Sequence, residues 1–161
     1  MRHASWVRGI TMIEVLVVIA IFAIVAGLGM YASMDSYRGS NFRNDRNLLI
    51  AALQRARAQS INNICLGTCT DGKVHGVAIR PGGVLTYVIF QTSSDYAGRG
   101  ADSVYDVIFP STPTTIITPA TAEITFERLT GNSTFQTIQL DGGGKTSVIE
   151  INLQGRISWT N

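Results

Sequence analysis

The most constraining feature of the chain is an uncharged apolar run at residues 15–32, VLVVIAIFAIVAGLGMYA. A run of this length is about long enough to cross a bilayer as an α-helix. A short basic segment, MRHASWVRG, precedes it and contains Arg2 and Arg8 but no acid. Near the start of the apolar segment stands one carboxylate, Glu14. An ionisable group inside a membrane helix costs about 2.5–3.5 kcal/mol on insertion scales, so Glu14 predicts a partner for its charge.

Three interpretations fit a basic segment that is followed by an apolar run. A secretory signal carries its small-residue cleavage site after the apolar core, whereas here Gly9 stands before the core and no clean Ala-x-Ala follows it. A simple membrane anchor accounts for the length and the basic flank, but it gives no reason for Glu14. The third interpretation, which we favour, is that the chain resembles the type IV prepilins. The resemblance lies in Gly9, the apolar Ile10, Thr11, and Glu14 five residues into the mature chain.

This resemblance implies a processing site and an assembly site. Prepilin peptidase would cleave between Gly9 and Ile10, remove the leader at residues 1–9, and leave an N-methylated Ile10. Glu14 would then neutralise the terminal amine of a neighbouring subunit, since a paired charge is tolerable in a helix bundle where a lone one is not. The alternative for Glu14 is a position near the cytoplasmic interface, where its carboxylate reaches water.

The length and charge of the mature chain fit one domain attached to a long helix. Two of the thirteen Lys and Arg residues leave with the leader, so eleven cations then balance the eleven acids. A near-neutral chain has no electrostatic footprint for nucleic acid. We expect a single-pass protein of the cytoplasmic (inner) membrane, with the basic leader inside and the globular domain on the outer, periplasmic side, before it enters a pilus or pseudopilus filament.

Two cysteines, Cys65 and Cys69, bracket the sequence Leu-Gly-Thr. Export would place both thiols in an oxidising compartment, so we predict a small-loop disulfide. The alternative is that both remain free. We predict no metal site here, because two thiols without a nearby His leave a zinc site half complete.

The chain beyond the apolar run continues as helix and then changes to strands. Residues 33–47 are polar and contain Gly39, which predicts a water-exposed, loosened segment. Amphipathic spacing then predicts one buried helix face, formed by Phe42, Leu49, Ala52, Leu53, Ala56 and Ser60. Alternating patterns and turn residues predict strands at 74–79, 84–90, 104–109, 114–118, 122–127, 135–140, 147–153 and 156–160.

These elements predict an α+β fold in which a long N-terminal helix packs on an antiparallel β-sheet domain, the pilin fold. The membrane-spanning half would occupy residues 10–32, the amphipathic half 33–64 and the globular β domain 65–161. Residues 53–63 and 149–157 resemble the minor pseudopilins of the type II secretion H class and their type IV pilus relatives. The resemblance implies a structural subunit whose partners are other pilins or pseudopilins, prepilin peptidase and an inner-membrane assembly platform.

Catalysis finds little support, and no enzyme activity and no cofactor are predicted. His75 is the only histidine outside the leader, and it falls in a strand pattern that is typical of a structural residue. The segment from Gly142 to Thr146 lacks the first Gly of a phosphate-binding loop and precedes a strand instead of a helix. Asp71 and Asp141 lie in Gly-containing turns, but neither has the further acidic ligands that a calcium site needs.

Two alternatives to a filament subunit of a secretion system or pilus stay open. In a DNA-uptake pilin, the basic tail would bind nucleic acid through Arg156 and Lys145, with Trp159 stacking on a base; phosphate binding draws on several cations, and the tail offers only two. The other alternative is a membrane-anchored β-domain that binds a partner but does not polymerise.

Overall fold

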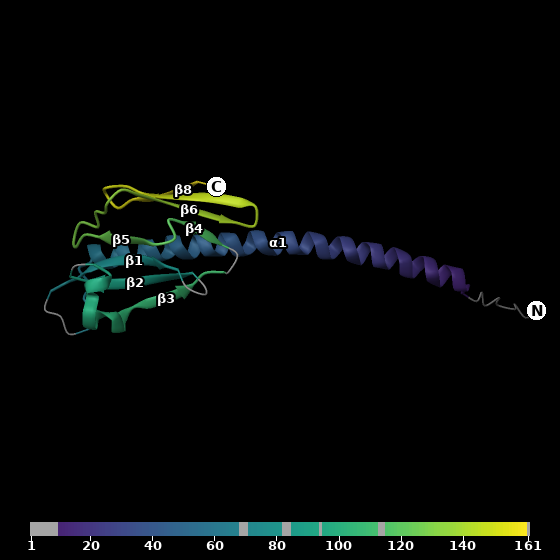
Figure 1. Cartoon of the computed structure of the whole chain (residues 1–161), viewed down its shortest axis with the longest axis horizontal. Coiled ribbons are helices and arrows are strands. Elements are labelled where there is room, and N and C mark those ends of the chain that lie inside the picture. Colours follow the sequence, from purple (N-terminus) through teal and green to yellow (C-terminus); the bar gives the residue numbers. More distant parts are fainter. Residues whose placement is uncertain (1–9, 68–70, 82–84, 94, 113–114, 161) are drawn as a thin grey trace, which may run out of the picture. The chain divides into compact units, whose positions relative to one another are not determined.

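The computed structural model describes residues 10–67, 71–81, 85–93, 95–112 and 115–160, without the side chains of 31–33 and 35. The leader, with Gly9, and Cys69 lie outside the described residues. The chain divides into two compact units, Met1–Tyr37 and Arg38–Asn161. One 50-residue helix, α1 (Met12–Ile61), passes from the first unit into the second, and the remaining elements are strands and one 3₁₀ segment. The predicted α+β fold class is confirmed (Figure 1).

The first part of α1 is apolar on every side. The 19 residues Met12–Met30 are long and apolar enough to cross a membrane, and none of them is buried in the structure. Gly27 and Gly29 each cost a helix roughly 1 kcal/mol relative to Ala. The helix nevertheless continues through both, and a Cβ at either position would meet nothing within 4 Å.

The second part of α1 buries the predicted face. All six residues of that face are buried, which confirms the helical spacing. The prediction that residues 33–47 are water-exposed and loosened is wrong in two respects, because α1 is unbroken here and Gly39 and Asp45 are buried. Asp45 lies three residues after Phe42 and four residues before Leu49, so it falls on the same buried face.

Sheet A has four antiparallel strands in the order β3 (Val107–Pro110), β2 (Thr86–Thr92), β1 (Val74–Arg80) and β5 (Ala122–Phe126). The predicted hairpin is confirmed, with Val77 opposite Ile89 in the β1–β2 pair. The turn residues 82–84 lie outside the described part of the chain. Val77 and Ile89 are both buried on the face that contributes to the main core.

Sheet B is also antiparallel, in the order β4 (Ile116–Thr118), β6 (Gln136–Gly142), β7 (Lys145–Ile151) and β8 (Ile157–Thr160). Gly143 and Gly144 join β6 to β7, with φ values of 59° and 72°. Two consecutive residues with positive φ make a type I′ turn, whose twist matches that of the flanking strands. The strand pattern predicted these strands but did not divide them from sheet A.

The strand predicted at 104–109 is partly wrong. Strand β3 begins only at Val107, and residues Ala97–Tyr105 form a 3₁₀ segment, η1. The preceding Tyr96 packs its ring edge-on against Phe90 of β2, with centroids 5.1 Å apart. Arg99 Nε also donates to Asp106 Oδ2 at 2.9 Å. The segment is therefore held against the outer face of sheet A, where the buried cluster of Ala78, Val88 and Phe90 lies.

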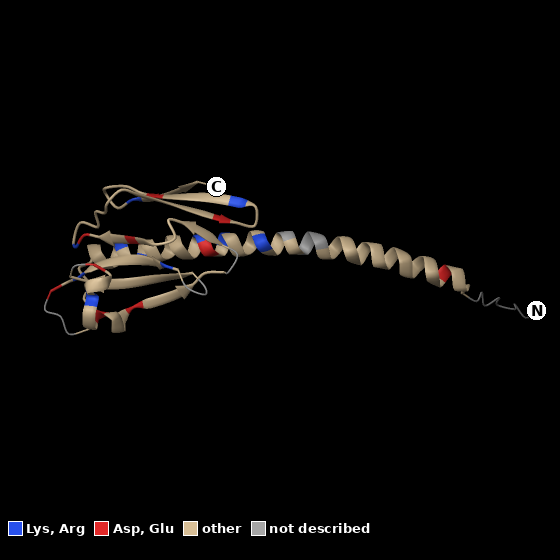
Figure 2. Ribbon diagram, in the orientation of Figure 1, with Lys and Arg blue, Asp and Glu red and all other residues tan. Residues whose placement is uncertain are grey.

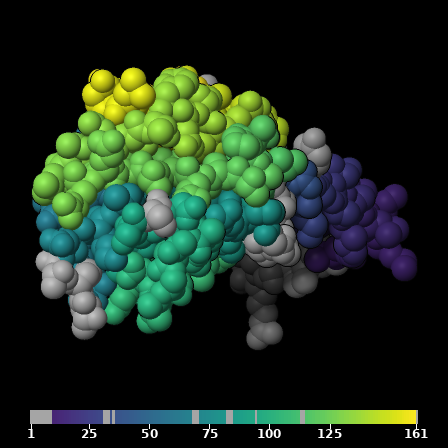
Figure 3. Space-filling model, turned by 60° about the vertical axis from the view of Figure 1, so that its left-hand side comes forward, coloured from purple at the N-terminus to yellow at the C-terminus, as the bar shows by residue number. Residues whose placement is uncertain are grey.

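The main core of unit Arg38–Asn161 combines α1 with the inner faces of both sheets. It includes Leu49 and Leu53 from α1, Ile79 from sheet A, and Ile138 and Ile149 from sheet B, all of them fully buried. In Figure 3 the C-terminal strands, in lime to yellow, cover the upper part of this unit and β1–β3, in teal to green, the lower part. The helix face and two sheet faces thus bury one another, as a two-layer or three-layer domain requires.

Candidate functional site

The described part of the N-terminal motif, residues 10–14, leads into the first turn of α1. Thr11 precedes the helix, and its Oγ1 and carbonyl oxygen accept hydrogen bonds from the backbone N–H of Glu14 at 3.3 and 3.1 Å. This is one half of a capping box, in which Thr at the N-cap position is followed by Glu three residues later. The sequence Thr-x-x-Glu ahead of an apolar run is the usual signal for such a start, so these four residues alone could have located the first turn of the helix.

Glu14 is the only charged residue in Met12–Met30, and Figure 2 shows it as a single acidic position near the start of α1. A carboxylate in the first turn is favoured by the helix dipole. Within the described residues Glu14 forms no ion pair. The site therefore offers a negative charge at the end of an apolar helix, close in sequence to Ile10, whose side chain is 76% exposed.

The apolar surface around this charge is unusually large for a protein in water. The large side chains between Met12 and Met30 are all exposed, from 45% at Val18 to 85% at Met12. An exposed apolar surface of this extent marks a membrane or protein interaction site. Lipid tails or the apolar faces of other helices would cover it equally well, because both present hydrocarbon.

The loop that follows α1 is held against sheet A by hydrogen bonds of a buried side chain of β2, Gln91. Its Oε1 accepts from the backbone N–H of Leu66 at 2.9 Å, and its Nε2 donates to the Leu66 carbonyl at 2.7 Å and to Asp102 at 3.1 Å. Cys65 in this loop is disulfide-bonded. Because Cys69 lies outside the described residues, the pairing of Cys65 with Cys69 stays a prediction.

His75 is a buried residue of β1 whose ring is held by the loop that follows α1. Its Nε2 lies 2.9 Å from the Ile64 carbonyl, so the neutral ring donates there and keeps Nδ1 unprotonated. Nδ1 is buried and has no hydrogen-bond partner among the described residues. Burial lowers the pKa of His75 from 6.5, and the hydrogen bond to Ile64 opposes this by a smaller amount.

The lowered pKa of His75 predicts a stability loss in mild acid. The unfolded chain binds the proton more readily than the folded chain, so the free energy of unfolding should fall as the pH drops below about 6.5. His75→Gln keeps an Nε2–H donor and removes the titration, so its unfolding free energy should change less between pH 7 and pH 5. Denaturant titrations of both proteins in detergent would test this, and parallel pH profiles would contradict it.

The tail residues that a DNA site would need are not brought together. Lys145 pairs with Gly142 at one end of β7, while Arg156 lies just before β8 at the other end, beyond Ile151. Ile151 lies six positions after Lys145 along the strand, or about 20 Å away. Trp159 lies between these ends, opposite Ile149, and is 46% exposed. Arg156 instead shares a cleft of about 280 Å³ with Arg57 and neighbouring residues of α1.

A buried carboxylate at Asp45 on α1 is a site that the sequence pattern did not reveal. Asp45 is 1% exposed, and its carboxylate accepts from the Thr112 N–H at 3.1 Å and from the hydroxyls of Thr112 and Thr115 at 2.5 Å each. Burial raises the pKa of Tyr87, and the charge of Asp45 adds to this effect. The spacing from Phe42 and to Leu49 could have placed Asp45 on the buried face.

The two aspartates considered for calcium remain unsupported. Asp71 is exposed, and Asp141 accepts hydrogen bonds from Gln139 Nε2 at 2.9 Å and Thr146 Oγ1 at 2.6 Å. Among the described residues, no three or more His, Cys, Asp and Glu side chains gather where they could hold a metal ion.

Comparison with known proteins bears on the first 30 residues. The family described as the prokaryotic N-terminal methylation motif matches residues 7–30, which include Gly9, Ile10 and Glu14. No curated protein and no solved structure matches the chain. The motif points to a structural protein and fits inner-membrane anchoring before filament assembly. It supports a type IV pilin-like protein that is processed by prepilin peptidase.

Proposed function

We propose that the chain is a minor pilin or pseudopilin, a structural subunit of a type IV pilus or of a type II secretion filament. The observation that carries this proposal is the single carboxylate of Glu14 at the start of a fully exposed apolar helix, inside the matched methylation motif. A simple anchor needs the apolar helix but not the carboxylate, which costs energy in lipid.

The proposed sequence of events begins with a single-pass protein in the inner membrane, its leader in the cytoplasm. Cleavage between Gly9 and Ile10 creates an amine at the start of the apolar helix, and this amine is methylated. During assembly, the helix leaves the lipid and packs among the helices of other subunits. The carboxylate of Glu14 then neutralises the amine of a neighbour, so that neither charge stays alone among apolar side chains.

In this proposal, the exposed surfaces of unit Arg38–Asn161 determine which other proteins the chain binds. Its core is closed by α1 and two sheets, so it has no need of the filament to bury its own apolar residues. Exposed apolar side chains do remain at Ile116, Phe135 and Leu153. These are candidate contacts with other pilins or pseudopilins, or with the assembly platform.

Intact mass and N-terminal sequencing would test the processing step. In cells with prepilin peptidase, we expect the membrane-bound protein to start at methylated Ile10. In otherwise identical cells that lack the peptidase, the full chain from Met1 should accumulate. The same Met1 form in both strains would contradict the proposal and leave a membrane-anchored domain that does not polymerise.

A further inference from the structure

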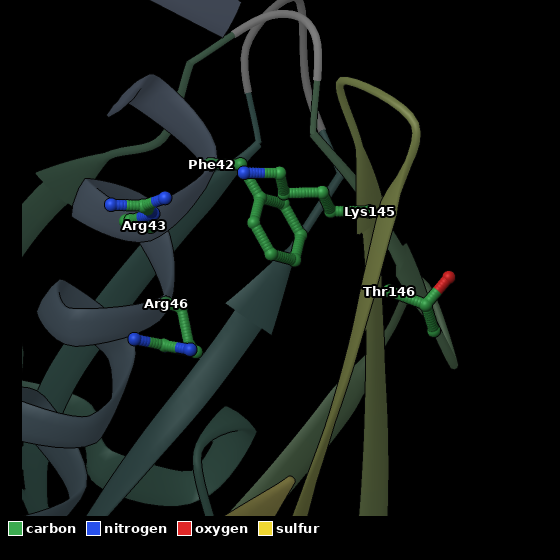
Figure 4. A pocket seen from close by; sticks show the side chains of 5 residues that line it. All are labelled: Phe42, Arg43, Arg46, Lys145 and Thr146. Carbon is green, nitrogen blue, oxygen red and sulfur yellow. The ribbon is translucent and has the colours of Figure 1, made fainter. Parts of the chain in front are cut away.

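A basic cleft of about 560 Å³ opens between α1 and the start of β7, lined by Phe42, Arg43, Arg46, Lys145 and Thr146. Figure 4 shows Arg43 and Arg46 projecting from α1, while Lys145 reaches from the β6–β7 hairpin toward Phe42. The cleft therefore collects cations that are about a hundred residues apart in the sequence. The methylation motif does not extend to it, since the matched residues end at position 30.

The β6–β7 hairpin packs closely against the backbone of α1 at two glycines. Lys145 Nζ lies 3.2 Å from the position that a Cβ would take on Gly39. Arg38 backbone atoms lie 3.2 Å from the corresponding position on Gly143, in the turn of the hairpin. The missing side chains at Gly39 and Gly143 thus allow the hairpin to approach the helix and bring the Lys145 ammonium to the same cleft as Arg43.

Two of the three cations that line this cleft form no ion pair with an acid among the described residues. Neither Arg43 nor Lys145 forms an ion pair with any residue in the described part of the chain. Arg46 donates from Nε and Nη2 to the neutral Asn47 side chain at 3.4 and 3.3 Å. Cations that converge on one cleft repel each other, so an anion that binds them lowers this repulsion. The planar guanidinium groups of Arg43 and Arg46 can each donate two parallel hydrogen bonds to a carboxylate or a phosphate.

We propose that this cleft binds the phosphate of an anionic phospholipid in the membrane that anchors the chain. Arg43 follows Met30, the end of the apolar segment, by 13 residues, so even a fully extended chain keeps it within about 45 Å of that segment. This tether holds the cleft at a high effective concentration of lipid headgroups. Basic pockets next to membrane segments recognise anionic headgroups in this way.

The geometry favours one headgroup over a nucleic acid. Nucleic-acid binding needs several cations arranged along a groove that tracks the phosphate backbone. Here three cations line a single cleft, and the other tail cation, Arg156, lies beyond the far end of β7. The mature chain also carries as many acids as cations, which gives little general attraction for a polyanion.

The test is a lipid titration of the full mature chain in neutral detergent micelles, followed by native mass spectrometry. Phosphatidylglycerol should bind more tightly than phosphatidylcholine with the same acyl chains. Arg43→Gln with Lys145→Gln should weaken phosphatidylglycerol binding about 30-fold, since each cation near a membrane surface contributes roughly a factor of five. The same variant should leave phosphatidylcholine binding unchanged.

A matched variant, Arg55→Gln with Arg156→Gln, removes two exposed cations outside the cleft. It should weaken phosphatidylglycerol binding less than twofold. If both variants lost phosphatidylglycerol binding equally, net charge alone would explain the effect and the proposal would be overturned. The proposal would also be overturned if neither variant lost binding. Arg43→Lys with Lys145→Arg keeps both charges and should bind like the parent chain, which separates loss of binding from loss of folding.

Two further ligands distinguish the source of the phosphate. Soluble glycerol phosphate that binds as tightly as phosphatidylglycerol would assign the cleft to a free phosphate and overturn the lipid proposal. A short DNA duplex that binds through Arg43 and Lys145, without a phosphatidylglycerol preference, would overturn it in favour of nucleic acid. This lipid proposal rests on the proposed membrane anchoring. The two can fail separately, because the lipid proposal is judged by headgroup preference in micelles. The proposed function is judged by the mass and N-terminal residue of the protein from cells.

Discussion

Replacing Glu14 by Gln should abolish filament assembly and leave membrane insertion unchanged. Gln serves at the third position of a capping box as well as Glu does, so α1 should begin at the same residue. Only the negative charge is lost. The amine of a neighbouring subunit would then be packed among apolar helices without a counter-charge. Removing one partner of a buried ion pair costs about 3–5 kcal/mol, which predicts at least a hundredfold loss of assembled filament.

The measurement is the amount of this chain in sheared filaments relative to the membrane fraction. Thr11→Val is the matched control, because it removes the hydroxyl that accepts from the Glu14 N–H but keeps the carboxylate. Loss of an N-cap side chain costs about 1 kcal/mol, so assembly should persist at a reduced level. If Glu14→Gln assembled like the parent chain while Thr11→Val did not, Glu14 would serve only to start the helix.

The N-terminal part of the molecule was predictable because its signals are local. The long apolar run, the lone carboxylate and the proposed processing residues all fall within the first 32 positions, and the matched residues 7–30 lie within this stretch. The buried face of α1 was equally accessible, since helical spacing decides which side chains share a face. Leu49, Leu53 and Ala56 are each fully buried, as that spacing predicted.

The division of the strands into two sheets depends on pairings that the strand pattern does not encode. β5 follows β4 in the sequence, yet β5 pairs with β1 and β4 pairs with β6. An alternating pattern shows which side chains of a strand face inward, but it does not identify the neighbouring strand. For the same reason, the convergence of Lys145 with Arg43 could not be foreseen, and Lys145 was grouped with Arg156 because both lie in the tail.

The 3₁₀ segment η1 was missed because tertiary contacts outweigh its local pattern. Val104 and Tyr105 are typical of strands, and they stand directly before residues that do form β3. The structure instead fixes the segment through Tyr96, whose ring lies beneath the Arg80 and Arg99 guanidinium groups at 4.1 and 3.7 Å. The contact with Arg80 joins the segment to β1, which lies earlier in the chain, so the local pattern of residues 97–105 does not contain it.

Asp45→Ala should strongly destabilise the folded chain. The sequence predicted a polar, water-exposed position, yet this carboxylate accepts hydrogen bonds from one backbone N–H and two hydroxyls in the segment at 112–115. A hydrogen bond to a charged group contributes about 1.5–3 kcal/mol, and each buried donor left unsatisfied costs about 1–3 kcal/mol. We therefore expect the free energy of unfolding to fall by about 3 kcal/mol or more.

The size of this loss should depend on hydrogen bonding and not on helix propensity. Ala is the better helix former, so α1 itself gains slightly from the change. Asp45→Asn keeps one acceptor oxygen and should lose less, while Asn44→Ala, at an exposed neighbouring position, should stay within about 0.5 kcal/mol. Denaturant unfolding of the mature chain in detergent, followed by the fluorescence of Trp159, would measure all three. An Asp45→Ala protein as stable as Asn44→Ala would show that the two threonine hydroxyls, which lie 3.2 Å apart, satisfy each other without the carboxylate.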